Sequence, residues 1–211
     1  GGLINVLERA SVHGVSHGTR VKIIFPSSIA AYGFKSIDLK KDAGTVQEND
    51  FLEPVTMYGC NKVYCEQVGH WYGKHWRSLS GDERPIDFRC LRYPGLISGE
   101  TIPSGGTSDY LPEMIHAAAR GNEYECFVSE DTKIPFMTMP KAIEATLQLS
   151  EAPQENLNST VYNIASFAIT AGQGFDLLKK YYPNFKCTFN PDIRRSRIVN
   201  SWPENVCVNS A

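Results

Sequence analysis

The spacing of hydrophobic and polar positions at the start of the chain predicts a helix followed by a buried strand. Apolar residues recur at helical intervals over residues 3–10, and the glycines within residues 14–18 are expected to end that helix. Residues 21–25 are a β-branched apolar run that meets Pro-Ser-Ser at 26–28, a pattern typical of a parallel strand running into a loop. Side chains at such strand ends face the crevice above an open α/β sheet, which makes this end a candidate site.

A second helix and strand follow a segment with loop character. Residues 34–55 are charged and contain glycine and proline, so we expect a loop there. Residues 56–77 predict a helix, residues 78–85 are a polar insert, and residues 86–93 predict a strand that ends at Pro-Gly. One face of this helix carries an aromatic stripe that we expect to be buried: Tyr64, Val68, Trp71, Tyr72 and His75. The alternation of helix and strand predicts an α/β fold with a parallel sheet.

Beyond residue 100, loops rich in glycine and proline separate shorter elements. Periodicity and capping residues predict three helices, and short apolar runs predict two strands. The helices are expected over residues 109–120, 140–151 and 175–182, and the strands over residues 124–128 and 160–165.

Composition and charge narrow the classes of partner. The chain has 211 residues, of which 42% are hydrophobic and 21% are charged, and its formal net charge is -2. Nucleic acids and anionic membranes call for a clustered basic face, so we expect neither as a partner. The short basic cluster of Arg194, Arg195 and Arg197 is interpreted as a solvated loop.

The chain shows no targeting or metal-binding pattern. It lacks an apolar run of about 18 residues and a secretion signal, so we expect a cytoplasmic protein, or a mitochondrial matrix protein if a transit peptide precedes these residues. The histidines are not spaced as metal ligands, so no metal site is predicted. We expect reduced, non-catalytic thiols at the six cysteines, which are residues 60, 65, 90, 126, 187 and 207.

Tyr58 and Lys62 form a Y-x-x-x-K pair on the predicted helix. Residues four apart on a helix project from the same face, and an ammonium beside a phenol favours the phenolate, which can act as a general base. An ordinary exposed helix face remains the other interpretation. Tyr182 and Lys186 show the same spacing, but Pro183 makes a shared helical face improbable.

Ser28 completes the candidate site, because it lies at the end of the first predicted strand while Tyr-Pro-Gly at 93–95 ends the second. Ser28 could hydrogen-bond a reacting oxygen, Tyr58 could exchange its proton, and Lys62 could hold the tyrosine and a cofactor ribose. A serine in this position could instead be a simple loop or capping residue.

At these residues the chain resembles the extended short-chain dehydrogenase/reductase family of NAD-dependent epimerases and dehydratases, and within it the branch of L-threonine 3-dehydrogenases. The most specific matches are Arg-Tyr-Pro-Gly at 92–95 and Gly-Gly-Thr-x-Asp-Tyr at 105–110. The matching segments are residues 25–33, 57–62, 89–98, 105–110, 124–126, 151–153, 161–164 and 201–203.

The resemblance implies NAD-dependent oxidation of L-threonine to 2-amino-3-ketobutyrate, with a homodimer formed through the helix that carries Tyr58 and Lys62. It implies that Tyr58 is the general base, Lys62 its partner and Ser28 the hydroxyl that orients the substrate. The implied substrate-binding residues are Ser28, Tyr58, Gly106, Thr107 and Trp202. The implied cofactor-binding residues are Ser27, Tyr58, Lys62, Tyr93, Pro94, Gly95 and Ile97.

The resemblance also implies a domain plan. Residues 1–100 would form part of a Rossmann-like NAD(P)-binding region, and residues 101–211 mostly a small α+β substrate-binding lobe, with 135–165 returning to the core. No G-x-x-G-x-x-G turn for the dinucleotide phosphates is present, so we expect a fragment covering the C-terminal half of the Rossmann-like sheet. A nucleotide-sugar epimerase or dehydratase, and an inactive packed or dimerising fragment, stay open as alternatives.

Overall fold

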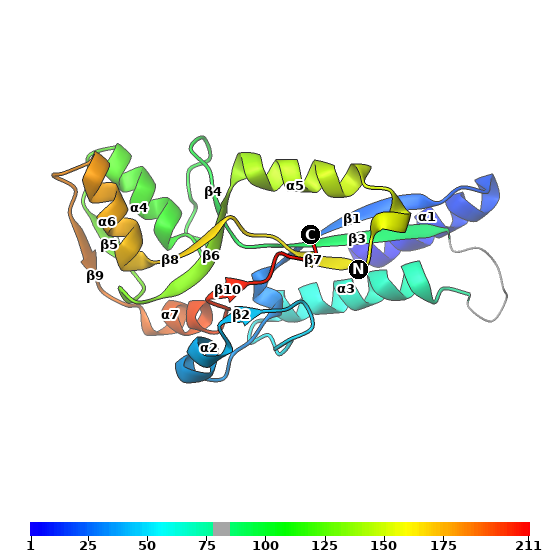
Figure 1. Ribbon diagram of the computed structural model, residues 1–211, viewed down its shortest axis with the longest axis horizontal. Helices are drawn as coiled ribbons and strands as arrows, with labels where there is room; N and C mark the ends of the chain where they lie inside the picture. Colours follow the sequence, from blue (N-terminus) through cyan, green and yellow to red (C-terminus); the bar gives the residue numbers. More distant parts are fainter. Residues whose placement is uncertain (78–84) are drawn as a thin grey trace.

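The computed structural model describes residues 1–77 and 85–211, so the predicted polar insert lies outside the described residues except for Pro85. The chain is elongated, with a sheet covered by helices at one end and a smaller lobe at the other (Figure 1). The lobe consists of α4 Tyr110–Ala119, β5 Tyr124–Cys126, α6 Ala171–Tyr181 and β9 Cys187–Phe189. Among the described helices, none is both long and apolar enough to cross a membrane.

Three parallel strands form the main sheet, in the order β1-β3-β7, which confirms the predicted parallel arrangement. The strands are β1 Val21–Ser28, β3 Ile86–Tyr93 and β7 Val161–Asn163. Ser28 is the register partner of Tyr93, so β1 and β3 end at the same edge. This shared edge is where the candidate site lies.

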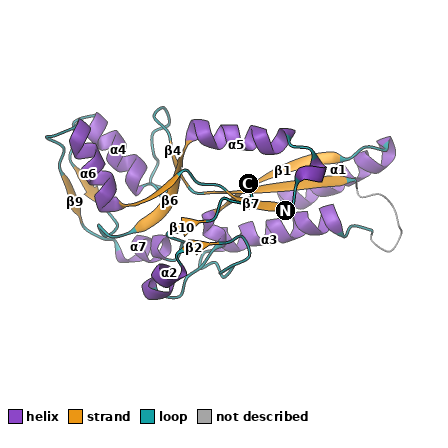
Figure 2. Cartoon of the chain, in the orientation of Figure 1, coloured by secondary structure: helices purple, strands orange, loops and turns teal. Residues whose placement is uncertain are grey.

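Helices cover both faces of this sheet (Figure 2). Phe88 and Cys90 of β3 pack with Leu7 and Tyr72 from α1 Gly2–His17 and α3 Met57–Lys74. Leu91 of β3 faces the other way and packs with α5 Met139–Glu151. Successive side chains of β3 point to opposite faces of the sheet, so this strand packs against both helical layers.

The first helix extends beyond its predicted end. Gly14 lies inside α1. A Cβ at this position would lie 2.6 Å from Cβ of Pro85, so the close contact between the helix and Pro85 requires glycine here. Gly18, with φ of 61°, caps the helix in the left-handed conformation. The prediction that the stretch of residues 14–18 ends the helix is therefore confirmed, and the residue that ends it is Gly18.

Residues 34–55 are not all loop, which corrects a second prediction. They contain α2 Ile37–Ala43 and β2 Thr45–Val46, and β2 pairs with β10 Asn205–Val206. Ser36 caps α2 by accepting a hydrogen bond from the Leu39 amide at 3.1 Å. This capping serine was the local signal for the helix.

The buried face of α3 differs from the predicted stripe. Tyr72 is buried, but Tyr64 and Trp71 remain 52% and 49% exposed. The helix approaches the sheet through glycines instead, and a Cβ at Gly69 would lie 2.1 Å from the Phe88 ring. The expectation that the whole stripe is buried is therefore wrong for the single chain.

The smaller elements follow the predicted order, with several additions. Those that overlap predictions are α4 Tyr110–Ala119, β5 Tyr124–Cys126 and α6 Ala171–Tyr181. Those not predicted are η1 Ile29–Ala31, β4 Gly95–Ile97, β6 Lys133–Thr138, η2 Gln154–Asn156, β8 Phe167–Thr170, β9 Cys187–Phe189 and α7 Ile193–Asn200. The order β4-β6-β8 forms one small sheet, in which β8 is antiparallel to β6, and β5 pairs with β9.

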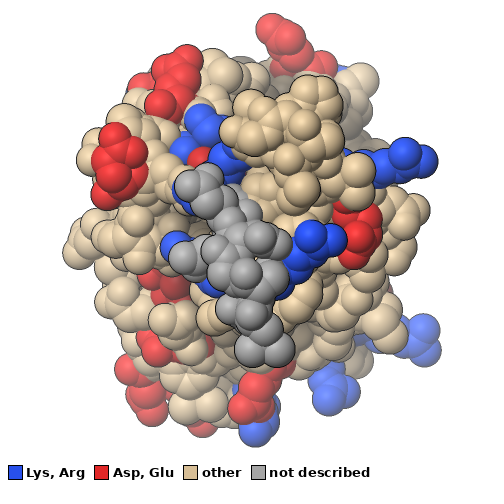
Figure 3. Space-filling model, turned by 90° about the vertical axis from the view of Figure 1, so that its right-hand side faces the viewer, with Lys and Arg blue, Asp and Glu red and all other residues tan. Residues whose placement is uncertain are grey.

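The basic cluster lies on α7, so the predicted loop was wrong, whereas Arg194 and Arg197 are solvent-exposed as predicted. The Arg195 guanidinium stacks on the Phe127 ring, 3.2 Å from the ring centroid, and donates to the Gly106 carbonyl at 3.1 Å. On the end of the molecule seen in Figure 3, basic and acidic side chains are interspersed.

Candidate active site

Ser28 stands where β1 ends and η1 begins. Its Oγ accepts a hydrogen bond from the Ala30 amide at 3.1 Å, so the interpretation as a capping serine is confirmed. The same residue also lines two adjoining clefts. Its oxygen already accepts one bond, and its single proton can still be donated to a ligand.

Tyr58 and Lys62 lie one turn apart near the start of α3. Thr56 caps the helix by accepting a bond from the Gly59 amide at 3.0 Å, which fixes the first turn. The Lys62 ammonium lies 5.2 Å from the centroid of the Tyr58 ring and donates to the Pro26 carbonyl. The lysine therefore connects the tyrosine helix to the end of β1.

A first cleft, of about 470 Å³, opens over the ends of β1 and β3. Its wall contains five of the predicted cofactor-binding residues, namely Ser27, Tyr58, Lys62, Tyr93 and Pro94. A cation, hydroxyl groups and an apolar wall thus lie together in one depression.

A second cleft, of about 440 Å³, adjoins the first and shares Ser28, Tyr58, Pro94 and Ser108 with it. It brings together all five predicted substrate-binding residues: Ser28, Tyr58, Gly106, Thr107 and Trp202. Gly95 lines this second cleft and not the first. Ile97 lines neither, because it lies on β4 and packs at the margin of the largest core cluster.

One wall of the first cleft was missed by sequence reasoning. It comes from α5 and consists of Met139, Ala142, Ile143 and Thr146. The Thr146 hydroxyl lies 2.5 Å from the Tyr93 hydroxyl, which connects the helix to the end of β3. The spacing of these four residues predicts a common helical face, but it does not reveal which cleft that face lines.

The loop that carries Gly106 is held in one conformation. Gly105 has φ of 84°, and the Gly106 amide donates to the Asp109 carboxylate at 2.7 Å. Arg195 binds the Gly106 carbonyl from the other side. Because both backbone groups of Gly106 are satisfied within the chain, Gly106 offers the second cleft only a surface, and the hydroxyls of Thr107 and Ser108 are the polar groups that this part of the loop offers to a ligand.

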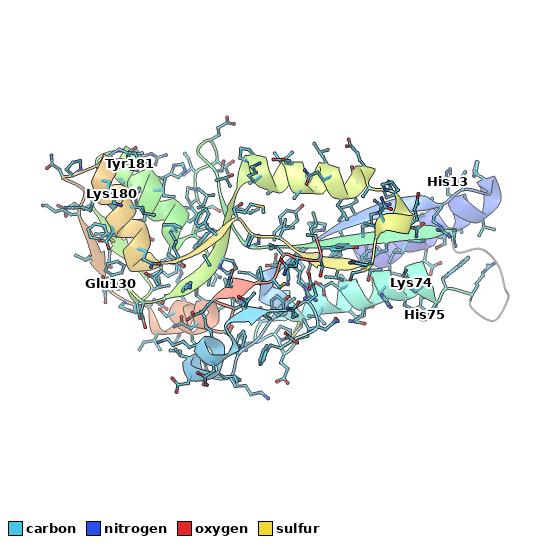
Figure 4. The ribbon with its side chains drawn as sticks, in the orientation of Figure 1. His13, Lys74, His75, Glu130, Lys180 and Tyr181 are labelled. Carbon is cyan, nitrogen blue, oxygen red and sulfur yellow. The ribbon has the colours of Figure 1, made fainter. Side chains whose placement is uncertain are left out.

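Among the described residues, no cysteine or histidine lines either cleft. Burial raises the pKa of the Cys90 thiol, and raises that of Cys126 to about 12, which disfavours the nucleophilic thiolate at both. His13 and His75 lie at the end of the molecule remote from the lobe (Figure 4). Within residues 1–77 and 85–211, no three His, Cys, Asp or Glu side chains are grouped to hold a metal ion.

Residues 1–165 match the model of the NAD dependent epimerase/dehydratase family. The chain belongs to this family. Its α/β fold with parallel sheets matches those of solved members, and the family is NAD-dependent.

Relatives within the epimerase/dehydratase family include threonine dehydrogenases. The chain is 35% identical over 204 residues to the mitochondrial L-threonine 3-dehydrogenase of Bos taurus, covering 97% of the chain but 50% of the relative. It is 34% identical over 207 residues to an uncharacterised epimerase/dehydratase of Staphylococcus aureus, covering 98% and 59%. The chain thus spans about half the length of the curated threonine dehydrogenases it matches.

Solved structures of the family superpose closely. The apo form of the GalE-like L-threonine dehydrogenase from Cupriavidus necator gives a TM-score of 0.86 at 37% identity, covering 99% of this chain and 69% of that one. The L-threonine dehydrogenase from Clostridium difficile gives 0.85 at 32% identity, covering 99% and 60%.

The first cleft fits the nicotinamide and ribose half of the family's cofactor. Lys62 is a suitable donor for ribose hydroxyls, while Pro94 and Leu96 offer an apolar surface to a flat ring. The fit covers this half of the dinucleotide alone, because the described residues around the cleft form no glycine-rich phosphate turn.

Proposed function

We propose that this chain carries the catalytic and substrate-side part of an NAD-dependent oxidation of L-threonine to 2-amino-3-ketobutyrate. The observation that carries the proposal is the second cleft, where Ser28 and Tyr58 share a wall with Gly106, Thr107 and Trp202. The identity of about 35% to mammalian threonine dehydrogenases supports the choice of substrate.

In the proposed reaction Tyr58 removes the proton of the β-hydroxyl group. The Lys62 ammonium, close to the Tyr58 ring, stabilises the phenolate. The Ser28 hydroxyl donates a hydrogen bond to the substrate oxygen and keeps its proton. As the C–O double bond forms, the hydroxyl proton goes to Tyr58 and the hydride leaves from Cβ.

NAD, when bound, supplies the hydride acceptor for that carbon. We propose that Lys62 and Tyr58 hold its ribose, and that Ser27, Tyr93 and Pro94 hold the nicotinamide side. We also propose, from the family pattern alone, that Gly95 and Ile97 bind the cofactor.

We propose the domain plan and the homodimer on separate grounds. Residues 1–100 would form part of the dinucleotide-binding region and 101–211 mostly the substrate lobe. The return of 135–165 to the core is supported by the pairing of β7 with β3. The homodimer through α3 is supported by the half-exposed aromatic side chains Tyr64 and Trp71.

The proposed activity is tested on the protein at its natural length, which contains the residues described above. L-threonine should support NADH formation, and Tyr58→Phe should lower kcat by about a hundredfold or more, because the general base is lost. Tyr181→Phe, which alters an exposed tyrosine of the lobe, is the matched control and should leave kcat unchanged. Equal rates in the two variants would contradict the assignment of Tyr58.

A nucleotide-sugar epimerase is the second candidate, favoured by the epimerase/dehydratase relative from Staphylococcus aureus. Saturation-transfer NMR with L-threonine and with UDP-sugars separates the two. We expect transfer to threonine alone. Transfer to a UDP-sugar alone would replace the proposed substrate, and transfer to neither would favour the alternative of an inactive chain.

A further inference from the structure

A buried ion pair lies directly behind the clefts. Glu66 of α3 and Arg92 of β3 are each 1% exposed. They form a bidentate ion pair, in which Arg92 Nη2 donates to Glu66 Oε2 at 2.6 Å and Arg92 Nε donates to Glu66 Oε1 at 2.9 Å. Removing two charges from water can cost as much free energy as their attraction returns, so stability alone is a weak explanation for this pair.

The guanidinium of Arg92 is bonded on its remaining side as well. Its Nη1 donates to the Tyr32 hydroxyl at 2.9 Å and to the Glu48 carbonyl at 2.5 Å. The Tyr32 hydroxyl in turn donates to Asn163 Oδ1 at 2.7 Å. Arg92 therefore joins β3 to the segment after η1, the loop after β2 and, through Tyr32, the end of β7.

The carboxylate of Glu66 reaches the wall of the first cleft. Its Oε1 also accepts a hydrogen bond from Ser27, which lines that cleft and precedes Ser28. Glu66 lies one helical turn beyond Lys62 and two beyond Tyr58 on the same helix.

Arg92 lies next to the other wall, because Tyr93 and Pro94 follow it directly. The end of β1, the middle of α3 and the end of β3 each contribute one side chain to a single junction: Ser27, Glu66 and Arg92. These three elements also carry Ser28, the Tyr58 and Lys62 pair, and Tyr93.

We propose that Glu66 and Arg92 are positioning residues, whose buried pair fixes α3 against the ends of β1 and β3 so that Tyr58 and Lys62 face Ser28. Neither residue contacts the open cleft itself. The catalytic consequence rests on the proposed function, whereas the positioning of the helix does not.

The chain offers a matched control on the same strand. Asp87 and Arg89 also form a buried pair, with a 2.6 Å contact. Arg89 is bonded further to the carbonyls of Leu149 and Ala152 at the end of α5. Neither member of this pair lines the two clefts.

The first measurement is independent of activity. Amide hydrogen exchange is followed in Glu66→Gln and Asp87→Asn of the natural-length protein, over segments 26–31 and 57–62. Glu66→Gln should accelerate exchange there at least about tenfold, while Asp87→Asn should change it less than about twofold. Equal acceleration by both variants would overturn the proposal.

The second measurement is the split between kcat and KM for L-threonine. Glu66→Gln should lower kcat about tenfold or more with a smaller change in KM, and Asp87→Asn should leave both within about twofold. An unaltered protein without threonine turnover would refute the proposed function, and the exchange result would still decide the positioning role.

A double variant tests the same role without leaving an unpaired buried charge that could prevent folding. Glu66→Met combined with Arg92→Met removes both charges and leaves no unpaired ion, so the protein should fold. Its exchange over 26–31 and 57–62 should stay fast and its kcat low. Slow exchange, or a kcat like that of the unaltered protein, would show that the pair is dispensable for positioning and would overturn the proposal.

Discussion

At the scale of single residues, the buried lysine of α2 makes stability depend on pH. Lys40 is 2% exposed, and its ammonium donates to the Lys133 carbonyl at 2.8 Å. Burial lowers the pKa of Lys40 to about 8, against the opposing attraction of Glu204 and Asp131. Between this value and its ordinary value of 10.5, the unfolded chain keeps a proton that the folded chain has lost.

Stability should therefore rise with pH through this window, by roughly 3 kcal/mol from Lys40 alone. Below about pH 8 both states hold the proton and the contribution is constant. Lys40→Met should remove this rise, whereas Lys41→Met, at the exposed neighbouring position, should keep it. Urea unfolding at pH 7 to 10.5 measures the difference, and equal slopes for the two variants would refute it.

Residue chemistry was also the most predictable part of the site. Ser28, Tyr58 and Lys62 could be proposed because strand ends and helical spacing are local properties of the sequence. Glu66 and Arg92 could not, because their pairing is set by tertiary packing between α3 and β3. The pattern around Glu66 is that of an ordinary polar helix position.

At the scale of elements, the first turn of α3 is held against η1 by a glycine. A Cβ at Gly59 would lie 2.1 Å from the Ala30 carbonyl oxygen, so Gly59→Ala should cost about 1–3 kcal/mol through overpacking. It should also displace Tyr58 and lower kcat. Thermal unfolding and initial rates of the natural-length protein test both effects.

Gly73 of the same helix is the control. A Cβ there would lie 3.5 Å from Phe88 Cβ, an ordinary contact, so Gly73→Ala should stabilise the helix by up to about 1 kcal/mol. The two substitutions should thus change the melting temperature in opposite directions. A change of the melting temperature in the same direction in both variants would show that α3 is not tightly packed against η1 at Gly59.

The longest elements were predicted well, and the short ones only in part. The helix at 56–77 and the strand at 86–93 appear as α3 and β3, since each has enough residues to show its period. The strands β4, β8 and β9 have only three or four residues, too few to show alternation. The helix α2 was not predicted, because its polar residues resemble those of a charged loop.

At the scale of the whole molecule, β1 is an edge strand. It pairs with β3 on one side, and within the described residues no strand covers its other side. Its sequence is nevertheless the apolar run Val-Lys-Ile-Ile-Phe, which is typical of a central strand. An open apolar edge is a template for pairing with another chain.

We therefore expect the 211-residue chain, prepared alone, to self-associate. Ile24→Lys places a charge on the open strand and should shift the light-scattering mass toward the monomer. Ile193→Lys, at an 85% exposed position of α7, should have no effect. Association through α3 would instead respond to Trp71→Lys, and a monomer at every concentration would contradict both modes. The comparison separates an open sheet edge from the proposed dimer face on α3, because each predicts loss of association from a different single substitution.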